Sequence, residues 1–566
     1  MDHETKYEKA KAERSSNVEK IVLSTSARKV VVAGPGTGKT FLFKQVLQAK
    51  RTTLTLTFVN SLVEDLSLEL YGISEVKTLH SFARSLLKTL WKKNINIFPK
   101  LSAVIEKDAR TLLGQQVDFA KIFHERDDAN PHIEFYRKRK KYYDNTYGYS
   151  DVIYAAVKYL EAHPDAVPRY EQIVVDEFQD FNLLEVSLIE LLATKSPILL
   201  AGDDDQALYD FKSASTKHIR ERHNDATHGY ESFNLPLCSR CTRVIVGATN
   251  DIVEQAEKNG LLSGRIKKPY RYFTDQDKDR VSDANPQIEW GHSFPKQLGW
   301  FIANELEGIA REVKGMFSVL VISPIRMQAR QLANALRSRG LHVEYSEGDA
   351  GKEPVLLDGL KLVLEDSKSN LGWRIIAEAL MNQKDFDGLL AESERPSAKS
   401  VFDLVDSGCK RKVRIMLGVL RKIRDSKPLD AEDIDVLKEI RVEPYDIVRE
   451  HLAGEFPPTR KGKTDPGIKK IPVMVTTVQS AKGLCADYVF IAHCDDRFFI
   501  GKNGLTDRAV CNFLVALTRA RKKVFLVSTQ KKKPTFVQWI QAQRVSGLEV
   551  GQDSEEIAEA VLELVD

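Results

Sequence analysis

The stretch that decides the fold is RKVVVAGPGTGKTFLFKQ, residues 28–45, where a β-branched run breaks into a glycine-rich turn and then a helical segment. The glycines let backbone N–H groups converge on phosphate oxygens, and the start of the helix adds its positive end. The strict spacing would place a glycine at Ala33. Lys39 is suited to neutralise the β- and γ-phosphates, and the Thr40 hydroxyl to ligate Mg²⁺. We therefore predict a phosphate-binding loop of Gly34, Pro35, Gly36, Thr37, Gly38, Lys39 and Thr40.

Two more apolar strands end in polar residues. EQIVVDEFQD (171–180) places Asp176 and Glu177 directly after a strand. The first carboxylate belongs near Mg²⁺, and the second is placed to accept a proton from an attacking water. SPILLAGDDDQALYDF (196–211) ends likewise and offers Gln206 as a sensor of a γ-phosphate. Three such units predict an α/β fold with a doubly wound parallel sheet and a site along its carboxyl edge.

The composition limits what the whole chain does. A length of 566 residues predicts several domains, about three to four. The net charge of +4 identifies no partner, and the six cysteines do not form a disulfide pattern. The polar N-terminal segment lacks a signal-peptide core and the apolar runs have strand length, so we expect a cytoplasmic protein with no membrane segment. Cys238 and Cys241 form a single Cys-x-x-Cys pair, so no structural zinc is expected.

The motifs, in their order along the chain, resemble those of the superfamily 1A helicases of the UvrD, Rep and PcrA type. The matching segments cover most of the chain: TLTLTFVNSLVEDL (53–66), VKTLHSFARSLL (76–87), VVDEFQD, LLAGDDDQALYDFKSAS, LPLCSRCTRVI, TTVQSAKGL (476–484) and FLVALTRARKKVFLV (513–527).

The resemblance implies a P-loop NTPase with two RecA-like doubly wound parallel-sheet domains and two mainly helical insertions. It implies Mg²⁺-dependent ATP hydrolysis and movement 3′ to 5′ on single-stranded or forked DNA. Asp176 then holds the metal, Glu177 is the base, Gln206 contacts the γ-phosphate, and Arg240 and Arg519 are arginine fingers. An arginine supplied on domain closure is worth roughly 10³–10⁵ in rate. The implied DNA contacts are Phe58, Asn60, His80 and Phe211.

The same resemblance sets the expected domain limits. Residues 1–90 and 166–235 form RecA-like domain 1A, and residues 236–349 and 466–566 form domain 2A. Residues 91–165 form helical insertion 1B, and residues 350–465 form a short helical insertion 2B, which corresponds to a mobile subdomain of the family.

Insertion 1B contains the segment FYRKRKKYYDN, with five consecutive basic residues flanked by aromatic ones. Cations and π-faces together suit a channel for a nucleic-acid strand, whereas a solvated surface is the alternative explanation of a charge run. The predicted contacts are Arg137, Lys138, Arg139, Lys140 and Lys141.

Departures from the family pattern gather at the nucleoside end of ATP. The segment before the phosphate loop has no glutamine to read adenine, and Ser239 and Cys485 stand where a stacking tyrosine and a ribose-binding glutamate are expected. We therefore expect GTP, and further CTP or dATP, to support hydrolysis within about tenfold of ATP, a difference of roughly 1.4 kcal/mol. Two functions stay open: a DNA helicase or translocase, and a nucleotide-switched sensor of DNA ends or single strands that regulates a partner nuclease, as in antiphage defence.

Overall fold

The computed structural model describes residues 3–58, 60–209, 213–313, 315–345, 353–395, 399–440, 471–502 and 504–548. The chain forms two compact units. The sheet unit contains residues 1–79, 167–348 and 462–566, and the helical unit contains residues 80–166 and 349–461. In the described part of the chain, no helix combines the length and the apolar character needed to cross a membrane.

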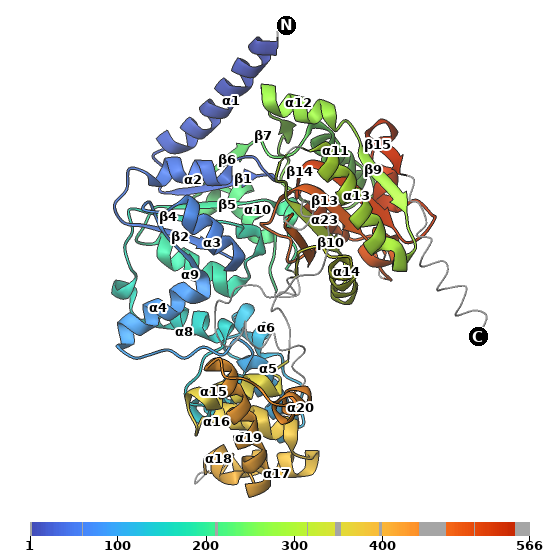
Figure 1. Ribbon diagram of the computed structural model, residues 1–566. Coiled ribbons are helices and arrows are strands. Elements are labelled where there is room, and N and C mark those ends of the chain that lie inside the picture. The colour runs from blue at the N-terminus through green and yellow to red at the C-terminus, as the bar shows by residue number, and fades with distance from the viewer. Residues whose placement is uncertain are drawn as a thin grey trace, which may run out of the picture. The chain divides into compact units, whose positions relative to one another are not determined.

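The first sheet of the sheet unit has six parallel strands in the order β3-β2-β4-β5-β1-β6. Its four inner strands, β2, β4, β5 and β1, are buried on both faces, which explains their β-branched and apolar sequences. Helix α2 and the carboxyl end of α1, through Val18 and Ile21, cover a core cluster on the sheet that includes Val31, Val174 and Leu199 (Figure 1). The elements are α1 (His3–Leu23), β1 (Arg28–Ala33), α2 (Lys39–Leu47), β2 (Thr53–Thr57), α3 (Asn60–Glu69), β3 (Glu75–Thr78), β4 (Gln172–Val175), α9 (Leu183–Ala193), β5 (Ile198–Gly202), α10 (Lys217–Asn224) and β6 (Glu231–Leu235).

The second sheet has seven parallel strands in the order β11-β12-β10-β13-β14-β9-β15. Successive residues of β10 pack into two different hydrophobic cores, because successive side chains of a strand point to opposite faces of the sheet. Leu320 and Ile322 join the core under α11, α23 and α24, whereas Val319 and Val321 join the core under α13 and α14. The elements are β9 (Ile288–His292), β10 (Val319–Ser323), β11 (Val343–Tyr345), β12 (Val473–Thr477), β13 (Ala486–Ala492), β14 (Ala520–Ser528), β15 (Val545–Leu548), α11 (Arg243–Lys258), α13 (Leu298–Glu312), α14 (Arg326–Ser338), α23 (Asp507–Leu517) and α24 (Thr535–Trp539).

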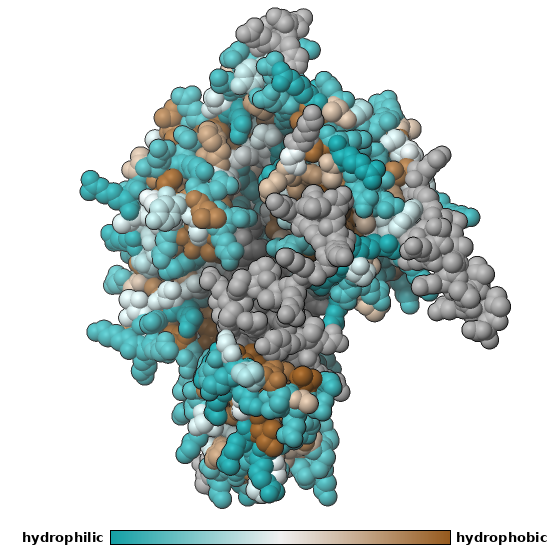
Figure 2. Space-filling view, in the orientation of Figure 1, coloured by the Kyte–Doolittle hydropathy of each residue, from teal (hydrophilic) through white to brown (hydrophobic). Residues whose placement is uncertain are grey.

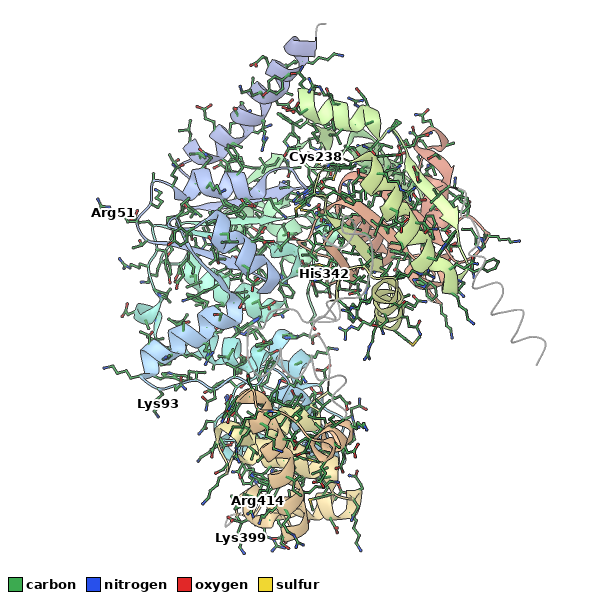
Figure 3. The ribbon with its side chains drawn as sticks, in the orientation of Figure 1. Arg51, Lys93, Cys238, His342, Lys399 and Arg414 are labelled. Atoms are coloured by element: carbon green, nitrogen blue, oxygen red, sulfur yellow. The ribbon has the colours of Figure 1, made fainter. Side chains whose placement is uncertain are left out.

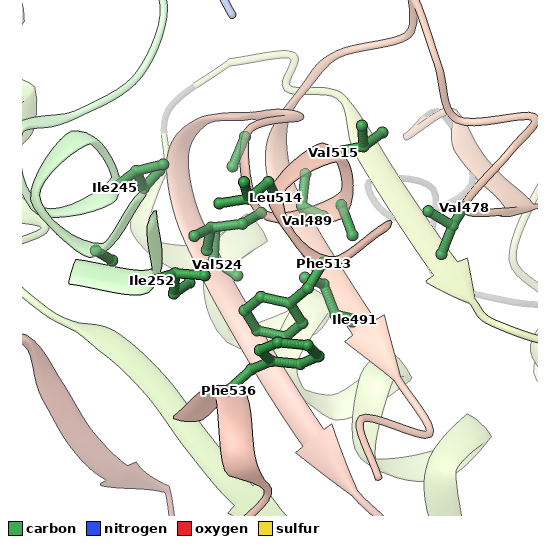
Figure 4. Packing of buried hydrophobic residues seen from close by; sticks show 14 of the residues in the cluster. Ile245, Ile252, Val478, Val489, Ile491, Phe513, Leu514, Val515, Val524 and Phe536 are labelled. Atoms are coloured by element: carbon green, nitrogen blue, oxygen red, sulfur yellow. The ribbon is translucent and has the colours of Figure 1, made fainter. Parts of the chain in front are cut away.

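Figure 4 shows the first of these two cores at close range. The rings of Phe513 and Phe536 stack there with centroids 4.8 Å apart. A short two-stranded sheet, β7 (Leu237–Cys238) with β8 (Arg271–Tyr272), lies beside α12 (Gln276–Ala284) in the chain segment between the two large sheets.

The helical unit draws helices from both insertions into one body. Its elements are α4 (Leu79–Trp91), α5 (Leu101–Leu113), α6 (Phe119–His124), α7 (His132–Tyr142), α8 (Tyr149–Ala162), α15 (Leu356–Glu365), α16 (Asn370–Leu380), α17 (Gln383–Glu392), α18 (Val401–Leu404), α19 (Ser407–Arg424) and α20 (Ala431–Glu439). The core of the second insertion also takes Leu112 and Tyr142 from the first. Its visible surface is largely hydrophilic, with apolar residues in small groups (Figure 2).

A buried ion cluster fastens the two insertions together. Asp108 of α5 accepts hydrogen bonds from Arg139 of α7 at 3.0 Å and from Arg374 of α16 at 2.8 Å and 2.9 Å. All three side chains are at most 1% exposed. The predicted mobile 2B region is thus packed into one unit with insertion 1B over residues 353–395 and 399–440, while residues 441–470 lie outside the described ones.

The predicted fold class, α/β with parallel sheets and helical insertions, is confirmed by this arrangement. The exact domain limits stay predictions.

Candidate nucleotide-binding site

The predicted phosphate loop joins β1 to α2 as the sequence indicates. Gly36 (φ 69°) and Gly38 (φ 95°) adopt left-handed backbone conformations, which glycine reaches without strain. Gly38 precedes the first residue of α2, and the Thr37 hydroxyl donates to the carbonyl oxygen of Gly34 at 2.9 Å. The loop therefore presents the amino end of a helix, the usual setting for a bound phosphate, with Thr40 half-buried in its first turn.

The segment after β7 holds this loop from the other side. Ser239 donates to the carbonyl oxygen of Gly36 from its amide at 2.9 Å and from its hydroxyl at 3.2 Å. A Cβ atom on Gly36 would lie 2.3 Å from the Cβ of Arg240, so this approach requires glycine as well. The contact brings Arg240, a predicted finger, against the phosphate loop.

The two predicted carboxylates meet the loop lysine at the carboxyl edge of the first sheet. Lys39 Nζ lies 2.9 Å from Glu177 Oε1 and 3.7 Å from Asp176 Oδ1. Glu177 has a left-handed backbone conformation (φ 55°). This conformation is uncommon for a residue with a side chain, and residues that adopt it cluster at functional sites. Three residues that the sequence assigned to phosphate, metal and base chemistry are thus in mutual contact.

The pKa values of the two carboxyl groups are pushed apart. Burial raises the pKa of Asp176 to about 6. Burial opposes ionisation of Glu177 too, but the positive charges of Lys39 and Lys482 hold the pKa of Glu177 well below its usual range. Gln179 Nε2 also donates to Glu177 Oε2 at 2.7 Å. Glu177 is therefore ionised at neutral pH, as a proton acceptor must be.

Side chains from the second sheet's half reach the same edge. Arg519 Nη2 donates to Gln206 Oε1 at 2.9 Å, and Gln206 Nε2 donates to Asp203 at 2.6 Å. Burial and the neighbouring charge of Arg240 lower the pKa of Arg519 to about 10, so both guanidinium groups carry their charge near pH 7. The structure thus brings Gln206, Arg240 and Arg519 together with the phosphate loop and carboxylates.

Lys482 is a site residue that sequence reasoning missed. Its side chain is 1% exposed, and Nζ lies 3.3 Å from Glu177 Oε2 and 2.9 Å from the Gln206 carbonyl oxygen, and also contacts Asp180 Oδ2. Its position within TTVQSAKGL was the available signal, because a lysine between small residues after a buried strand is unusual. Burial raises the pKa of its partner Asp180 to about 6.

Asp176 and Thr40 fit the oxygen ligands that Mg²⁺ prefers. Asp176 Oδ1 accepts the amide N–H of Glu177 at 2.9 Å, which fixes its orientation. When bound there, Mg²⁺ would neutralise phosphate charge. In the described part of the chain, the one cluster of three potential metal ligands is Asp203, Asp204 and Asp205. Lys268 Nζ lies within 2.9 Å of each of these carboxylates, so a cationic side chain already fills that position.

The residues found at the nucleoside positions are engaged otherwise. Ser239 binds the phosphate loop, as above, and Cys485 Sγ accepts a hydrogen bond from Arg521 Nη2 at 2.9 Å. Tyr270 is buried and donates its hydroxyl to the Pro35 carbonyl oxygen at 3.0 Å. Cys238, labelled in Figure 3, is the last residue of β7 and directly precedes Ser239.

The predicted DNA residues belong to both units: Phe58 and Asn60 to the sheet unit, and His80 to the helical unit. Phe58 follows β2 and packs against Phe181 and Tyr209, with ring centroids 5.7 Å and 4.7 Å apart. Asn60 begins α3, and His80 stacks on Tyr149 at 4.3 Å. Phe211 lies outside the described residues. Their proposed contacts with DNA stay predictions.

The five basic residues do not form one face, and the prediction of a DNA contact is wrong for Arg139, whose side chain is 1% exposed. Arg139 is buried in the ion cluster described above, because α7 needs a core-facing side at this position. Lys140 is 16% exposed, bonded to Asp151 at 3.3 Å and placed 3.7 Å from the ring centroid of Tyr147. Lys138 pairs with Glu394 at 2.6 Å. The exposed cations of the run are Lys138, Arg137, which lies 3.6 Å from Glu134, and Lys141.

Comparisons with known proteins agree with the motif order. Residues 124–227 match the family model of the UvrD/REP helicase N-terminal domain. The chain is 30% identical over 156 residues to the ATP-dependent DNA helicase srs2 of Schizosaccharomyces pombe (26% of this chain, 18% of that protein). It is 35% identical over 99 residues to DNA helicase II of Escherichia coli (17% and 13%). It is 26% identical over 130 residues to the exonuclease/helicase subunit RexA of Streptococcus pneumoniae (22% and 11%).

These matches confirm the resemblance to UvrD-type superfamily 1 helicases. The chain covers less than a fifth of the length of each of these relatives.

Proposed function

We propose that this UvrD-type superfamily 1 protein is a DNA-stimulated, Mg²⁺-dependent NTPase that moves 3′ to 5′ along single-stranded DNA and separates forked duplex. One observation carries the proposal. Lys39, Asp176 and Glu177 lie with Gln206 at the carboxyl edge of the first sheet. Arg519, which directly precedes β14 of the second sheet, donates a hydrogen bond to Gln206 at 2.9 Å. The named relatives, which are two DNA helicases and an exonuclease/helicase subunit, support it.

The chemistry that these residues supply is hydrolytic. Lys39 and the two arginines offer positive charge where a phosphoryl group would transfer, and such charge stabilises a loose transition state. Glu177, ionised and oriented by Gln179, is placed to accept a proton from water. Arg519, next to β14 of the second sheet, contacts Gln206, which follows β5 of the first sheet. Hydrolysis at this edge is therefore coupled to the contact between the two sheet-containing parts of the sheet unit.

The test uses nucleotide binding and turnover of the full chain with and without single-stranded DNA. We expect Lys39→Ala to weaken binding, and Glu177→Gln to retain binding but lose at least about a hundredfold in kcat, the usual share of a general base. Lys44→Ala is the matched control, because Lys44 lies on the same helix but pairs at the surface with Glu69 at 3.2 Å. Normal turnover in Glu177→Gln would refute the assigned base.

A second candidate function is a nucleotide-switched DNA sensor that controls a partner nuclease. Two observations favour it: one relative is named as an exonuclease/helicase subunit, and the 2B insertion packs with 1B in one helical unit. A strand-displacement assay separates the two functions. A motor displaces a long strand in a single binding event, whereas a sensor hydrolyses nucleotide on DNA without displacement and needs its partner for any cleavage.

A further inference from the structure

A guanidinium group lies over two aromatic rings beside the phosphate loop. Arg14 of α1 places its Cζ 5.3 Å from the ring centroid of Phe41 in α2 and 5.3 Å from that of Phe273, just after β8. The three side chains come from three separate segments, all within the sheet unit. We call them the Arg14 stack.

The Arg14 stack adjoins the residues that would bind phosphate. A Cβ atom on Gly38 would lie 3.1 Å from Arg14 Nη2, and Gly38 directly precedes Lys39. Arg14 makes no hydrogen bond or ion pair to any residue in the described ranges, although its side chain is half-buried. An arginine has five N–H donors in a planar fork that matches phosphate oxygens. These donors are therefore available next to the loop.

Phe41 supplies the flat apolar surface. It directly follows Thr40, yet 44% of its surface is exposed even with Arg14 against it. The ring of Tyr270 packs directly against Gly34 and leaves no space there, because a Cβ atom on Gly34 would lie 2.8 Å from that ring. Ser239 and Cys485 are bonded to protein groups, whereas Phe41 and Arg14 offer an exposed ring face and unbonded N–H donors beside the loop.

Resting on the proposed NTPase function, we propose that Phe41 and Arg14 bind the nucleoside half of the nucleotide. The base stacks on Phe41, and the Arg14 guanidinium donates to the phosphate oxygens nearest the ribose. Stacking on an aromatic ring tolerates every base, because each base has a π-face. Strong discrimination requires groups that hydrogen-bond one base edge and reject another, and neither side chain does so. The substrate class is therefore all four ribonucleoside triphosphates.

The experiment measures dissociation constants of non-hydrolysable analogues of ATP, GTP, CTP and UTP without DNA. We expect the four constants of the unaltered protein to lie within about tenfold of one another. Phe41→Ala should weaken all four by about tenfold, the scale of one stacking contact. Arg14→Ala should weaken them similarly and reduce the salt dependence of binding, because a cation is lost. Lys20→Ala, an exposed charge on the same helix, is the control and should change nothing.

Several results would overturn the inference. They are a preference above a hundredfold for one base, unchanged affinity in both variants, or tighter binding by Arg14→Ala, which would make Arg14 an obstacle in the slot. Lys39→Ala in the same titration separates the two proposals. If Lys39→Ala loses binding while Phe41→Ala and Arg14→Ala do not, the NTPase proposal stands and this inference fails. Melting temperatures of all variants, compared with the unaltered protein, exclude misfolding as the cause.

Discussion

The substitution Asp108→Asn tests the bond between the two insertions. Asp108 is 0% exposed and holds two arginines whose side chains are 0% and 1% exposed. Asparagine keeps an acceptor oxygen but removes the charge, which leaves two buried cations. Breaking one partner of a buried pair costs about 3–5 kcal/mol. Glu378 and Glu394, each 26% exposed, still contact the two guanidinium groups, so we expect the lower figure, about 3 kcal/mol.

The assay is differential scanning calorimetry of the full chain. For a unit of this size, about 3 kcal/mol lowers the midpoint of its transition by roughly 6–12 °C. The matched control is Asp128→Asn in the same unit. Asp128 also has two cationic partners, Arg126 and Lys158, each at 3.0 Å, but its side chain is 34% exposed. A surface pair is worth at most about 1 kcal/mol, so the control should shift little.

The pH dependence of this effect has a definite sign. Burial opposes ionisation of Asp108, but Arg374 and Arg139 hold its pKa below the usual range. A depressed carboxyl pKa stabilises the fold above the unfolded value, about 3.9, and the stabilisation is lost as pH falls through the folded value. The difference in transition midpoint between Asp108→Asn and its control Asp128→Asn should therefore be constant from about pH 5 to pH 8. Equal midpoints for Asp108→Asn and Asp128→Asn would refute the role of the cluster.

Three further predictions concern the sheet unit and the basic helix. Arg240→Ala and Arg519→Ala should each lower kcat by about 10³ or more while nucleotide affinity changes little, and a raised KM alone would make that residue a binding contact. Arg137→Gln with Lys141→Gln should flatten the slope of log K against log salt for single-stranded DNA by about one to two, and an unchanged slope would identify a solvated surface. Lys482→Met should move the acidic limb of the pH–rate profile to higher pH, because Glu177 loses a positive charge 3.3 Å away. Lys482→Arg keeps that charge and should return the limb to its original pH. Acidic limbs at the same pH in both variants would contradict this coupling.

The fold class followed from local sequence, but the strand order did not. Strand β1 (Arg28–Ala33) is apolar over residues 30–33, which indicates burial on both faces of a parallel sheet. The order β3-β2-β4-β5-β1-β6 depends on pairings between distant segments, such as Val30 with Leu200. No local pattern specifies those partners, because a fully apolar strand can pair with any similar strand.

The phosphate and carboxylate residues were accessible to sequence reasoning because their spacing encodes their chemistry. Lys39 and Glu177 each follow a strand or turn whose geometry a short motif fixes. Tyr270 and Arg14 had no such signal, since their contact with the phosphate loop depends on how distant segments fold back onto it. Sequence reasoning therefore found the groups proposed for the reaction and missed these two neighbours of the phosphate loop.

The error over the basic run has a simple geometric cause. Successive residues of an α-helix are rotated by about 100°, so five consecutive residues cover every side of the helix. A helix packed on one side must then bury at least one of them, and in α7 the buried position is Arg139. Asp108 offsets that burial with a counter-charge, and Arg374 from the second insertion shares it. One of the five residues predicted to contact DNA, Arg139, instead fastens the two insertions to each other. A search for the DNA path should therefore begin from the exposed cations Arg137, Lys138 and Lys141 rather than from the charge run as a whole.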